Sequence, residues 1–264
     1  MNRAERSSEI LAVLAREDSV DVDRLVGHLG VSPATVRRDL DALASRQLLV
    51  RTHGGAARGS VAYDLTERYR LGDDAGKRAI AAHASQLVTR GMVVGLSGGT
   101  TTAMVAQMLG MRPDLRDQSG RPTLTVVTNS VNIASTLAVR THIKVVVSGG
   151  VMHPHSYELV GPFAEETLGR LTCDVSFIGV DGMDPVHGFS VNEDSEAVVN
   201  AMIAARAQRA WVIADSVKMG TRAFATLPHV DGLGLITDEL VSAADVAAFN
   251  KAGHDVVVAA PAST

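Results

Sequence analysis

The first 45 residues carry apolar side chains at the spacing of amphipathic helices. A first helix is predicted from Ser7 to about Glu17. Asp21 suits the N-cap of a second helix. The apolar stripe of that helix has a complete i, i+3, i+4, i+7 pattern, made by Val22, Leu25, Val26 and Leu29. Gly30 follows where a C-terminal capping glycine is expected, so the second helix is predicted to end there.

A third helix is predicted to begin with Ser32 as N-cap and Pro33 at the first helical position. Its inward positions are Val36, Leu40 and Leu43. The opposite face carries Arg37 and Arg38. Two helices joined by a short glycine-containing turn predict a helix-turn-helix. An arginine pair on the second of these helices lies where a recognition helix contacts base edges and phosphates.

The next segment, Leu48 to Ala56, reads as a strand followed by a Gly54-Gly55 turn, which predicts a β-wing. From Arg37 to Arg58 there are five arginines against two acidic residues, although the whole chain has a net charge of −4. Agreement of caps, turn, wing and local charge predicts binding to double-stranded operator DNA. The candidate DNA-contacting residues are Ser32, Pro33, Thr35, Arg37, Arg38, Arg51 and His53.

From Lys77 onward, apolar runs alternate with helical patterns, beginning with a helix from Lys77 to about Thr89. The predicted strands are Met92–Leu96, Leu124–Thr128, Ile143–Ser148, Val175–Val180, Ala210–Ala214, Leu233–Thr237 and Asp255–Ala259. The predicted helices between them include Thr101–Leu109, Val131–Leu137, Pro162–Leu171, Ser195–Gln208 and Ser242–Lys251. Most strands lack polar alternation, as strands covered on both faces do. This order predicts an α/β fold with a largely parallel sheet.

The predicted fold class is therefore α/β, with two unlike domains. We expect a winged helix-turn-helix domain at residues 1–57, a linker at 58–76 and a larger, mainly parallel-sheet α/β domain at 77–264. Hydrophobic residues make up 46% of the chain and charged residues 20%, which is enough apolar material for a sizeable core. No apolar run reaches the roughly 18 residues that span a bilayer. Cys173 is the only cysteine, which fits a reducing cytoplasm, and we expect no membrane association.

Glycine and hydroxyl residues follow the first predicted strand of the second domain. Ser97-Gly98-Gly99-Thr100-Thr101-Thr102 lies between this strand and a helix. Glycines allow close approach to a ligand, and a helix start offers unpaired N–H groups and a positive dipole end. Such a junction suits a phosphate group. It is not a Walker loop, because no Gly-Lys-Ser/Thr follows.

Polar residues also follow the other strands, and ligands in such folds bind beyond the carboxyl ends of the strands. Lys218 is a point charge suited to phosphate, while Asp181 and Asp184 suit sugar hydroxyls. Thr128 and Ser130 are interpreted as caps of the following helix. The candidate ligand-binding residues are Ser97, Gly98, Gly99, Thr100, Thr101, Thr102, Asn129, Gly149, Gly150, Asp181, Asp184 and Lys218.

Nearly the whole chain resembles the DeoR family of bacterial transcriptional regulators. The amino-terminal likeness is carried by residues 31–40, VSPATVRRDL, followed by residues 51–56, RTHGGA. The second half is similar to the effector domain of that family at 97–102, 128–130, 148–150, 174–182, 201–203 and 214–218. The resemblance implies a fold similar to ribose 5-phosphate isomerase and a phosphorylated sugar or sugar-derived effector. A homo-oligomer is expected because one helix-turn-helix reads too short a site for genomic specificity, so such proteins usually bind paired half-sites. One departure is Val199-Asn200, where the family often has a basic pair. If that pair contacts ligand in relatives, the effector here is less anionic or differently placed.

Two hypotheses of different classes follow. The first is a repressor whose α/β domain binds a phosphorylated metabolite and changes DNA affinity. The second is an isomerase-like sugar-phosphate enzyme tethered to DNA, with Asp181, Asp184, Glu196 and Lys218 as an acid–base set. We favour the repressor, because no pairing of residues fixes a nucleophile or a base. The sequence implies no cofactor, and His153-Pro154-His155 is interpreted as a surface loop, not a metal site.

Overall fold

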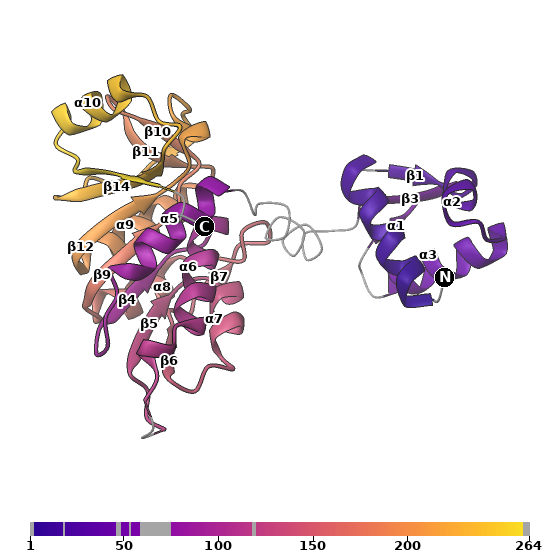
Figure 1. Ribbon diagram of the computed structural model, residues 1–264, viewed down its shortest axis with the longest axis horizontal. Coiled ribbons are helices and arrows are strands. Elements are labelled where there is room, and N and C mark those ends of the chain that lie inside the picture. The colour runs from indigo at the N-terminus through magenta and orange to yellow at the C-terminus, as the bar shows by residue number, and fades with distance from the viewer. Residues whose placement is uncertain are drawn as a thin grey trace. The chain divides into compact units, whose positions relative to one another are not determined.

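The structure is a computed structural model that describes residues 3–17, 19–45, 49–52, 54–58, 75–117 and 120–260. The chain forms two compact units, Met1–Gly72 and Asp73–Thr264 (Figure 1). The first unit contains α1 (Arg3–Glu17), β1 (Ser19–Asp21), α2 (Val22–Leu29), α3 (Pro33–Ser45), β2 (Leu49–Arg51) and β3 (Gly55–Arg58).

The first helix begins at Arg3, four residues before the predicted Ser7, and ends at Glu17 as predicted. The predicted bounds of the second helix and the predicted start of the third are confirmed. The Asp21 carboxylate accepts a hydrogen bond from the Arg24 N–H at 2.7 Å, and Gly30 ends α2 in the left-handed region with φ of 65°. Ser32 accepts from the Thr35 N–H at 3.3 Å and α3 begins at Pro33. The apolar faces of the three helices share one core with residues of all three strands, so the module has its own hydrophobic interior.

The wing is a hairpin of β2 and β3, in which Leu49 lies opposite Arg58. A third strand, β1, pairs with β3 and was not predicted. The Arg51 guanidinium contacts Asp41 at 2.9 Å and also donates to the Gly55 carbonyl oxygen. The candidate His53 lies outside the described residues.

Gly55 is the point at which β3 meets β1 most closely. A Cβ atom there would overlap the Val20 carbonyl oxygen, which belongs to the backbone and cannot turn aside. We expect Gly55→Ala to separate the two strands and to lower the free energy of unfolding of the module by about 1–3 kcal/mol. Gly54→Ala is the matched control, because a Cβ at Gly54 meets nothing within 4 Å. Thermal unfolding of both variants tests this, and equal stability would contradict it.

The second unit is built on a seven-stranded, fully parallel sheet of order β15-β14-β12-β9-β4-β5-β6. Its strands are β4 (Val93–Leu96), β5 (Leu124–Thr128), β6 (Ile143–Val147), β9 (Cys173–Ile178), β12 (Ala207–Ile213), β14 (Leu233–Asp238) and β15 (Val256–Ala259). All seven predicted strands are confirmed. Several boundaries differ by two or three residues: β9 begins at Cys173 and ends at Ile178, and α5 spans Ala75–Gln86. The helix predicted to reach Gln208 ends at Ala205, because β12 begins at Ala207 beside Cys173 of β9.

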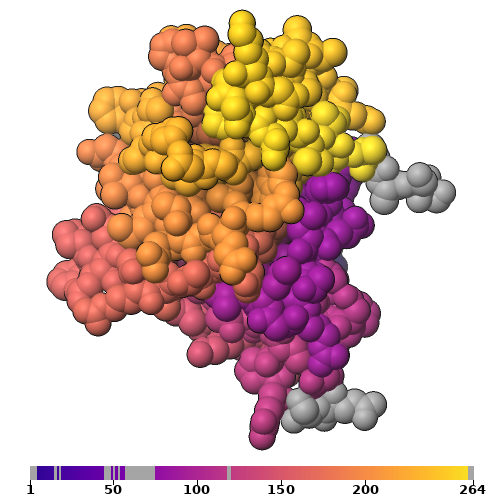
Figure 2. Space-filling model, turned by 90° about the vertical axis from the view of Figure 1, so that its left-hand side faces the viewer, coloured from indigo at the N-terminus to yellow at the C-terminus, as the bar shows by residue number. Residues whose placement is uncertain are grey.

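Helices cover both faces of the sheet (Figure 1). The helical segments are α5 (Ala75–Gln86), α6 (Thr100–Met111), η1 (Pro113–Leu115), α7 (Val131–Leu137), α8 (Pro162–Gly169), α9 (Asp194–Ala205), η2 (Ser216–Lys218) and α10 (Ala243–Lys251). α5 packs on α6, and α6 packs on α7, while α8, α9 and α10 contribute to one shared core. Figure 2 shows the yellow C-terminal segment beside the purple residues of α5, in agreement with the packing of α5 on β15.

Two small antiparallel sheets complete the unit. β7 (Val151–Met152) pairs with β8 (Leu159–Val160), and β11 (Gly188–Val191) pairs with both β10 (Gly182–Asp184) and β13 (Ala225–Thr226). None of these short strands was predicted. Within the described parts of the chain, no helix is both long and apolar enough to cross a membrane.

The strand order reverses between β4 and β9. From β4 the chain proceeds outward through β5 and β6, and it then returns to β9 on the other side of β4. In open α/β sheets, ligands bind at such a reversal, beyond the carboxyl ends of the two strands. Cys173 lies at the other end of β9, where burial raises the pKa of its thiol to about 11.

Candidate functional site

The loops after β4 and β9 contact each other at the strand reversal. The Gly179 N–H donates a hydrogen bond to the buried Ser97 hydroxyl at 2.9 Å. A Cβ atom at Gly179 would overlap the Gly98 carbonyl oxygen, so the two backbones are packed as closely as glycine allows. The predicted glycine–threonine loop is therefore brought together with the segment that leads to Asp181.

The N-terminus of α6 is uncapped by a side chain. Gly99 occupies the N-cap position with φ of 119°, a conformation that favours glycine. The Thr102 hydroxyl donates to the Gly99 carbonyl at 2.8 Å, which fixes the turn from within. Thr100 and Thr101 are the first two residues of the helix. First-turn N–H groups without a capping side chain are available to an anion.

Lys218 reaches the same corner from the segment after β12. Its ammonium group donates to the carbonyl oxygen of Val180, the residue that follows Gly179. Burial lowers the pKa of Lys218, and the nearby carboxylates of Asp181 and Asp215 oppose that shift. Lys77 of α5 pairs with Asp215 at 3.3 Å. Lys218 thus contacts Val180, next to Gly179, and Gly179 contacts the loop that leads into α6. The name β4–β9 corner is used below for this meeting of the loops after β4 and β9 with Lys218.

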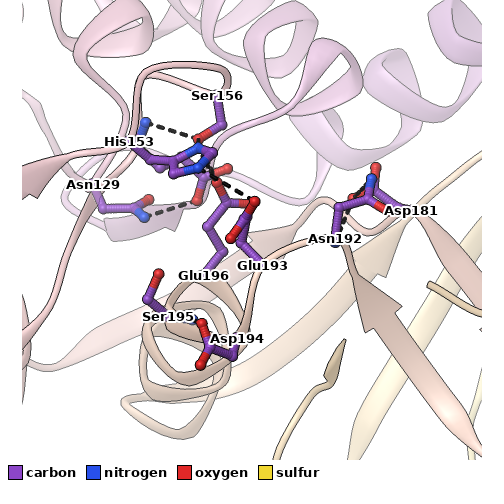
Figure 3. Close-up of polar contacts among 10 residues, drawn as sticks. Asn129, His153, Ser156, Asp181, Asn192, Glu193, Asp194, Ser195 and Glu196 are labelled. Atoms are coloured by element: carbon purple, nitrogen blue, oxygen red, sulfur yellow. Dashed lines mark hydrogen bonds and ion pairs between the residues drawn. The ribbon is translucent and has the colours of Figure 1, made fainter. Parts of the chain in front are cut away.

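The two candidate aspartates have different surroundings. Asp181 is half-buried and accepts from the backbone and side-chain N–H groups of Asn192 at 3.1 and 2.9 Å (Figure 3). Asp184 accepts from Arg222 at 2.9 Å and from the Val186 and His187 N–H groups at 2.8 and 2.9 Å. The Arg222 guanidinium is the main reason that the pKa of Asp184 is far below its usual range. These contacts commit the Asp184 carboxylate to the turn between β10 and β11.

The remaining candidates lie after β5 and β6. Asn129 is fully buried, whereas Gly149 is exposed and Gly150 is half-buried at the end of β6, two strands away from β4. Ser130 caps α7, since its hydroxyl accepts from Ile133, and the Thr128 hydroxyl accepts from the Ser130 N–H at 3.0 Å. The capping interpretation is confirmed for Ser130, whereas Thr128 bonds the N-cap residue and not the helix.

One residue of this corner was missed. Glu158 lies at the start of β8, and its carboxyl group accepts a hydrogen bond from the Asn129 side-chain amide at 2.9 Å. Its side chain is only 5% exposed. A single glutamate between Tyr157 and Leu159 matches no motif, and the one available signal was a charge at the edge of the apolar run Leu159-Val160.

Next to Glu158, the loop between β7 and β8 is tied to the start of α9. His153 lies 3.2 Å from Glu196 and 3.4 Å from Glu193, and the Ser156 hydroxyl donates to Glu196 (Figure 3). Among the described residues, no group of three or more His, Cys, Asp and Glu side chains is arranged to hold a metal ion. Val199 and Asn200, which replace the basic pair of the resemblance, are buried in α9.

The candidate DNA-contacting residues gather on α3. Arg37 and Arg38 are exposed, as are Ser32 and Pro33 at its start, while Thr35 is half-buried. The acidic residue between the arginines and Leu40 is turned inward: Asp39 is 3% exposed and accepts from Arg6 of α1 at 2.7 Å. The outer face of α3 therefore presents both arginines.

Comparisons with known proteins match both units of the chain. A family described as the DeoR-like helix-turn-helix domain matches residues 6–60, and one described as the DeoR C terminal sensor domain matches residues 73–239. The chain belongs to the DeoR family. It is thus a DNA-binding transcriptional regulator, and the tethered-enzyme hypothesis is set aside.

Relatives of this DeoR-family regulator match along almost their whole length. It is 33% identical over 257 residues to the HTH-type transcriptional regulator GlpR of Haloferax volcanii, covering 96% of this chain and 97% of that protein. It is 29% identical to the putative aga operon transcriptional repressor of Escherichia coli O157:H7, with 97% and 93% covered. It is 26% identical to the glycerol-3-phosphate regulon repressor of Escherichia coli K12, with 87% and 88% covered.

Among solved structures, ribose 5-phosphate isomerase A from Methanocaldococcus jannaschii matches the DeoR-family regulator over 54% of this chain and 53% of that one. The identity is 21% and the TM-score is 0.39. We draw no conclusion about activity from this likeness.

Proposed function

We propose that this DeoR-family regulator represses a carbohydrate-metabolism operon and is released from its operator by a phosphorylated sugar or a related metabolite. The observation that carries the proposal is the corner at the β4–β9 reversal. There the uncapped start of α6 and Lys218 flank one backbone turn. Helix N–H groups together with a lysine are a phosphate-binding combination. The names of two relatives, an aga operon repressor and a glycerol-3-phosphate regulon repressor, point to the same class of pathways.

The proposed binding mode divides the candidate residues between the two ends of an effector. The phosphate group contacts the loop from Ser97 to Thr102 and Lys218, and Asp181 accepts hydrogen bonds from sugar hydroxyls. Asp184 is the weakest member of the set, because Arg222 and two backbone N–H groups already occupy its carboxylate. Gly149 and Gly150 border the site from the end of β6.

The domain limits and the assembly belong to the same proposal. Residues 1–57 bind the operator, residues 58–76 connect the two domains, and residues 77–264 bind the effector. Operators with paired half-sites require at least a dimer. We expect the α/β domain to hold the copies together, since β6 is an edge strand and exposes Val147 beside Val151 and Met152. Light scattering of residues 77–264 measures the mass of the assembly.

A transcriptional regulator acts where the chromosome is, so we place the protein in the cytoplasm.

The test is a ligand screen followed by an operator assay. Glycerol 3-phosphate, ribose 5-phosphate and fructose 6-phosphate are added to the full-length protein and thermal unfolding is followed. A ligand that binds only the folded protein raises the midpoint. The ligand that does so is then titrated into the protein–operator complex. We expect release of DNA, and a stabilising ligand that leaves operator affinity unchanged would refute its role as effector.

A further inference from the structure

Glu158 lies against the loop Ser97–Thr102, although it comes from the segment directly before β8. Besides the contact with Asn129, its carboxyl group lies against the backbone of Gly98, whose N–H lowers the pKa of that carboxyl group. A Cβ atom at Gly98 would overlap the Glu158 side chain. A side chain at position 98 would have to displace the carboxyl end of Glu158, so the two residues pack directly against each other.

The backbone around Glu158 is fixed to the end of β5. The Leu159 N–H donates to the Asn129 carbonyl at 2.7 Å, and the Val131 N–H donates to the Tyr157 carbonyl at 3.1 Å. Tyr157 has φ of 59°, the one positive value at a non-glycine residue of the described chain. Strained conformations of this kind persist where the surrounding structure dictates them, and they cluster at ligand sites. The carboxyl group is thus held in place at a conformational cost.

Asn129 gives a second sign that the corner is built for a ligand. Its amide nitrogen is bonded to Glu158, whereas its fully buried amide oxygen has no hydrogen-bond partner among the described residues. Turning the amide over would exchange the two atoms and would still leave one polar end unused. A buried polar group without a partner is costly, so a donor that arrives with the ligand is favoured.

Acidic groups surround Glu158 and decide its charge. Burial is the main cause that raises the pKa of Glu158 to about 8, followed by the negative charge of Glu196 on α9, and Asp181 after β9 adds to it. Glu196 is itself paired with His153 and Ser156, and Asp181 is near Lys218. Glu158 is consequently mostly uncharged at pH 7 and mostly ionised at pH 9.

We propose that Glu158 is a positioning residue of the effector site: it holds the Gly98–Gly99 turn for the phosphate, and its charge makes effector affinity fall as the solution becomes alkaline. This inference rests on the proposed function. An uncharged carboxyl group accepts the Gly98 N–H without opposing an anion. An ionised one places a negative charge directly beside the loop and repels the phosphate. A phosphate monoester is already doubly charged above pH 7, so its own titration adds little in this range.

The test is calorimetric titration of the full-length protein with glycerol 3-phosphate and with inorganic phosphate, at pH 7 and pH 9. For the wild type we expect the dissociation constant to rise about tenfold between the two values. Glu158→Gln keeps an acceptor for Gly98 but cannot ionise, so its dissociation constant should match the wild type at pH 7 and change less than about twofold at pH 9. Lys218 is present in both proteins, so its contribution to phosphate binding is common to the two titrations.

Two controls separate this role from a general effect. Glu166→Gln removes an exposed carboxylate on α8 and should behave as the wild type does. Glu158→Asp keeps an ionisable group but withdraws it from Gly98, so it should bind more weakly while retaining pH dependence. If Glu158→Gln and the wild type lose affinity equally at pH 9, or if Glu158→Gln does not fold and Glu158→Asp binds as the wild type does at both pH values, the inference is overturned. If the wild type binds neither probe at pH 7, the β4–β9 corner is not a phosphate site, and the proposed binding mode fails together with the inference.

Discussion

Replacing Arg37 or Arg38 with alanine is expected to weaken operator binding by about 1–3 kcal/mol, roughly 5- to 150-fold, for each arginine that reads a base. Both side chains are exposed on α3, next to the capped start of that helix at Ser32 and Pro33. Neither substitution removes a core side chain, so the folded module should be retained. The measurement is fluorescence anisotropy with the mapped operator at fixed salt.

The salt dependence tells the two kinds of arginine contact apart. Replacing an arginine that contacts only phosphate should lower affinity for all DNA sequences and reduce the salt slope by about 1. Replacing an arginine that reads a base should lower affinity for the operator alone. Arg170→Ala is the control, since it removes an exposed arginine at the C-cap of α8 that pairs with Glu166. Unchanged operator affinity in both α3 variants would remove this helix as the reader.

Lys218→Ala is expected to separate effector response from DNA binding. Loss of a charge-assisted contact to phosphate should raise the effector concentration for half-release about 10- to 150-fold. Thr101→Val removes one hydroxyl at little change in volume and should raise it only about 2- to 12-fold. Neither residue lies in the N-terminal module, so operator affinity without effector should stay at the wild-type value. In cells both variants should repress and be hard to induce.

The decisive comparison is operator binding with and without effector for the wild type and both variants. A wild-type response in Lys218→Ala would mean that the phosphate does not bind at the β4–β9 corner. Lys218 is half-buried and contacts the Val180 carbonyl, so its replacement could also affect folding. Thermal unfolding of the variant is the control. Loss of operator binding in the absence of effector would show that the two functions are not separable by these substitutions.

The sequence was most informative where short-range order decides the structure. The inner strands β4, β5, β9 and β14 are almost entirely buried, so their apolar runs are visible in the sequence. The caps at Asp21, Ser32 and Ser130 act within three residues. β1 was missed because its three residues become a strand only by pairing with β3, far along the chain. The start of β12 was missed because Ala207 and Gln208 favour a helix until β9 pairs with them.

Within the candidate site, the same division holds. The loop at Ser97–Thr102 could be predicted from its glycine and threonine content. Lys218 could be predicted because it is a lysine among the polar residues that follow the strands. The role of Asp184 depends on Arg222, a partner 38 positions away, and that of Glu158 on Asn129 and Gly98, which are 29 and 60 positions away. Contacts over such separations leave no periodic trace, so the three-dimensional arrangement was needed to find them.

The single cysteine of this protein, Cys173, can report local opening of the central sheet through its reaction with a thiol reagent. Cys173 is 3% exposed in β9, between β4 and β12 at the centre of the sheet, and its high pKa keeps it unreactive while the sheet is closed. A thiol reagent therefore modifies the chain only when this part of the sheet opens, and the labelling rate measures how often that happens. Because β9 leads directly into the β4–β9 corner, a metabolite bound there should slow the labelling. The chain can thus be screened for its natural ligand without an attached dye, an operator or a known target gene.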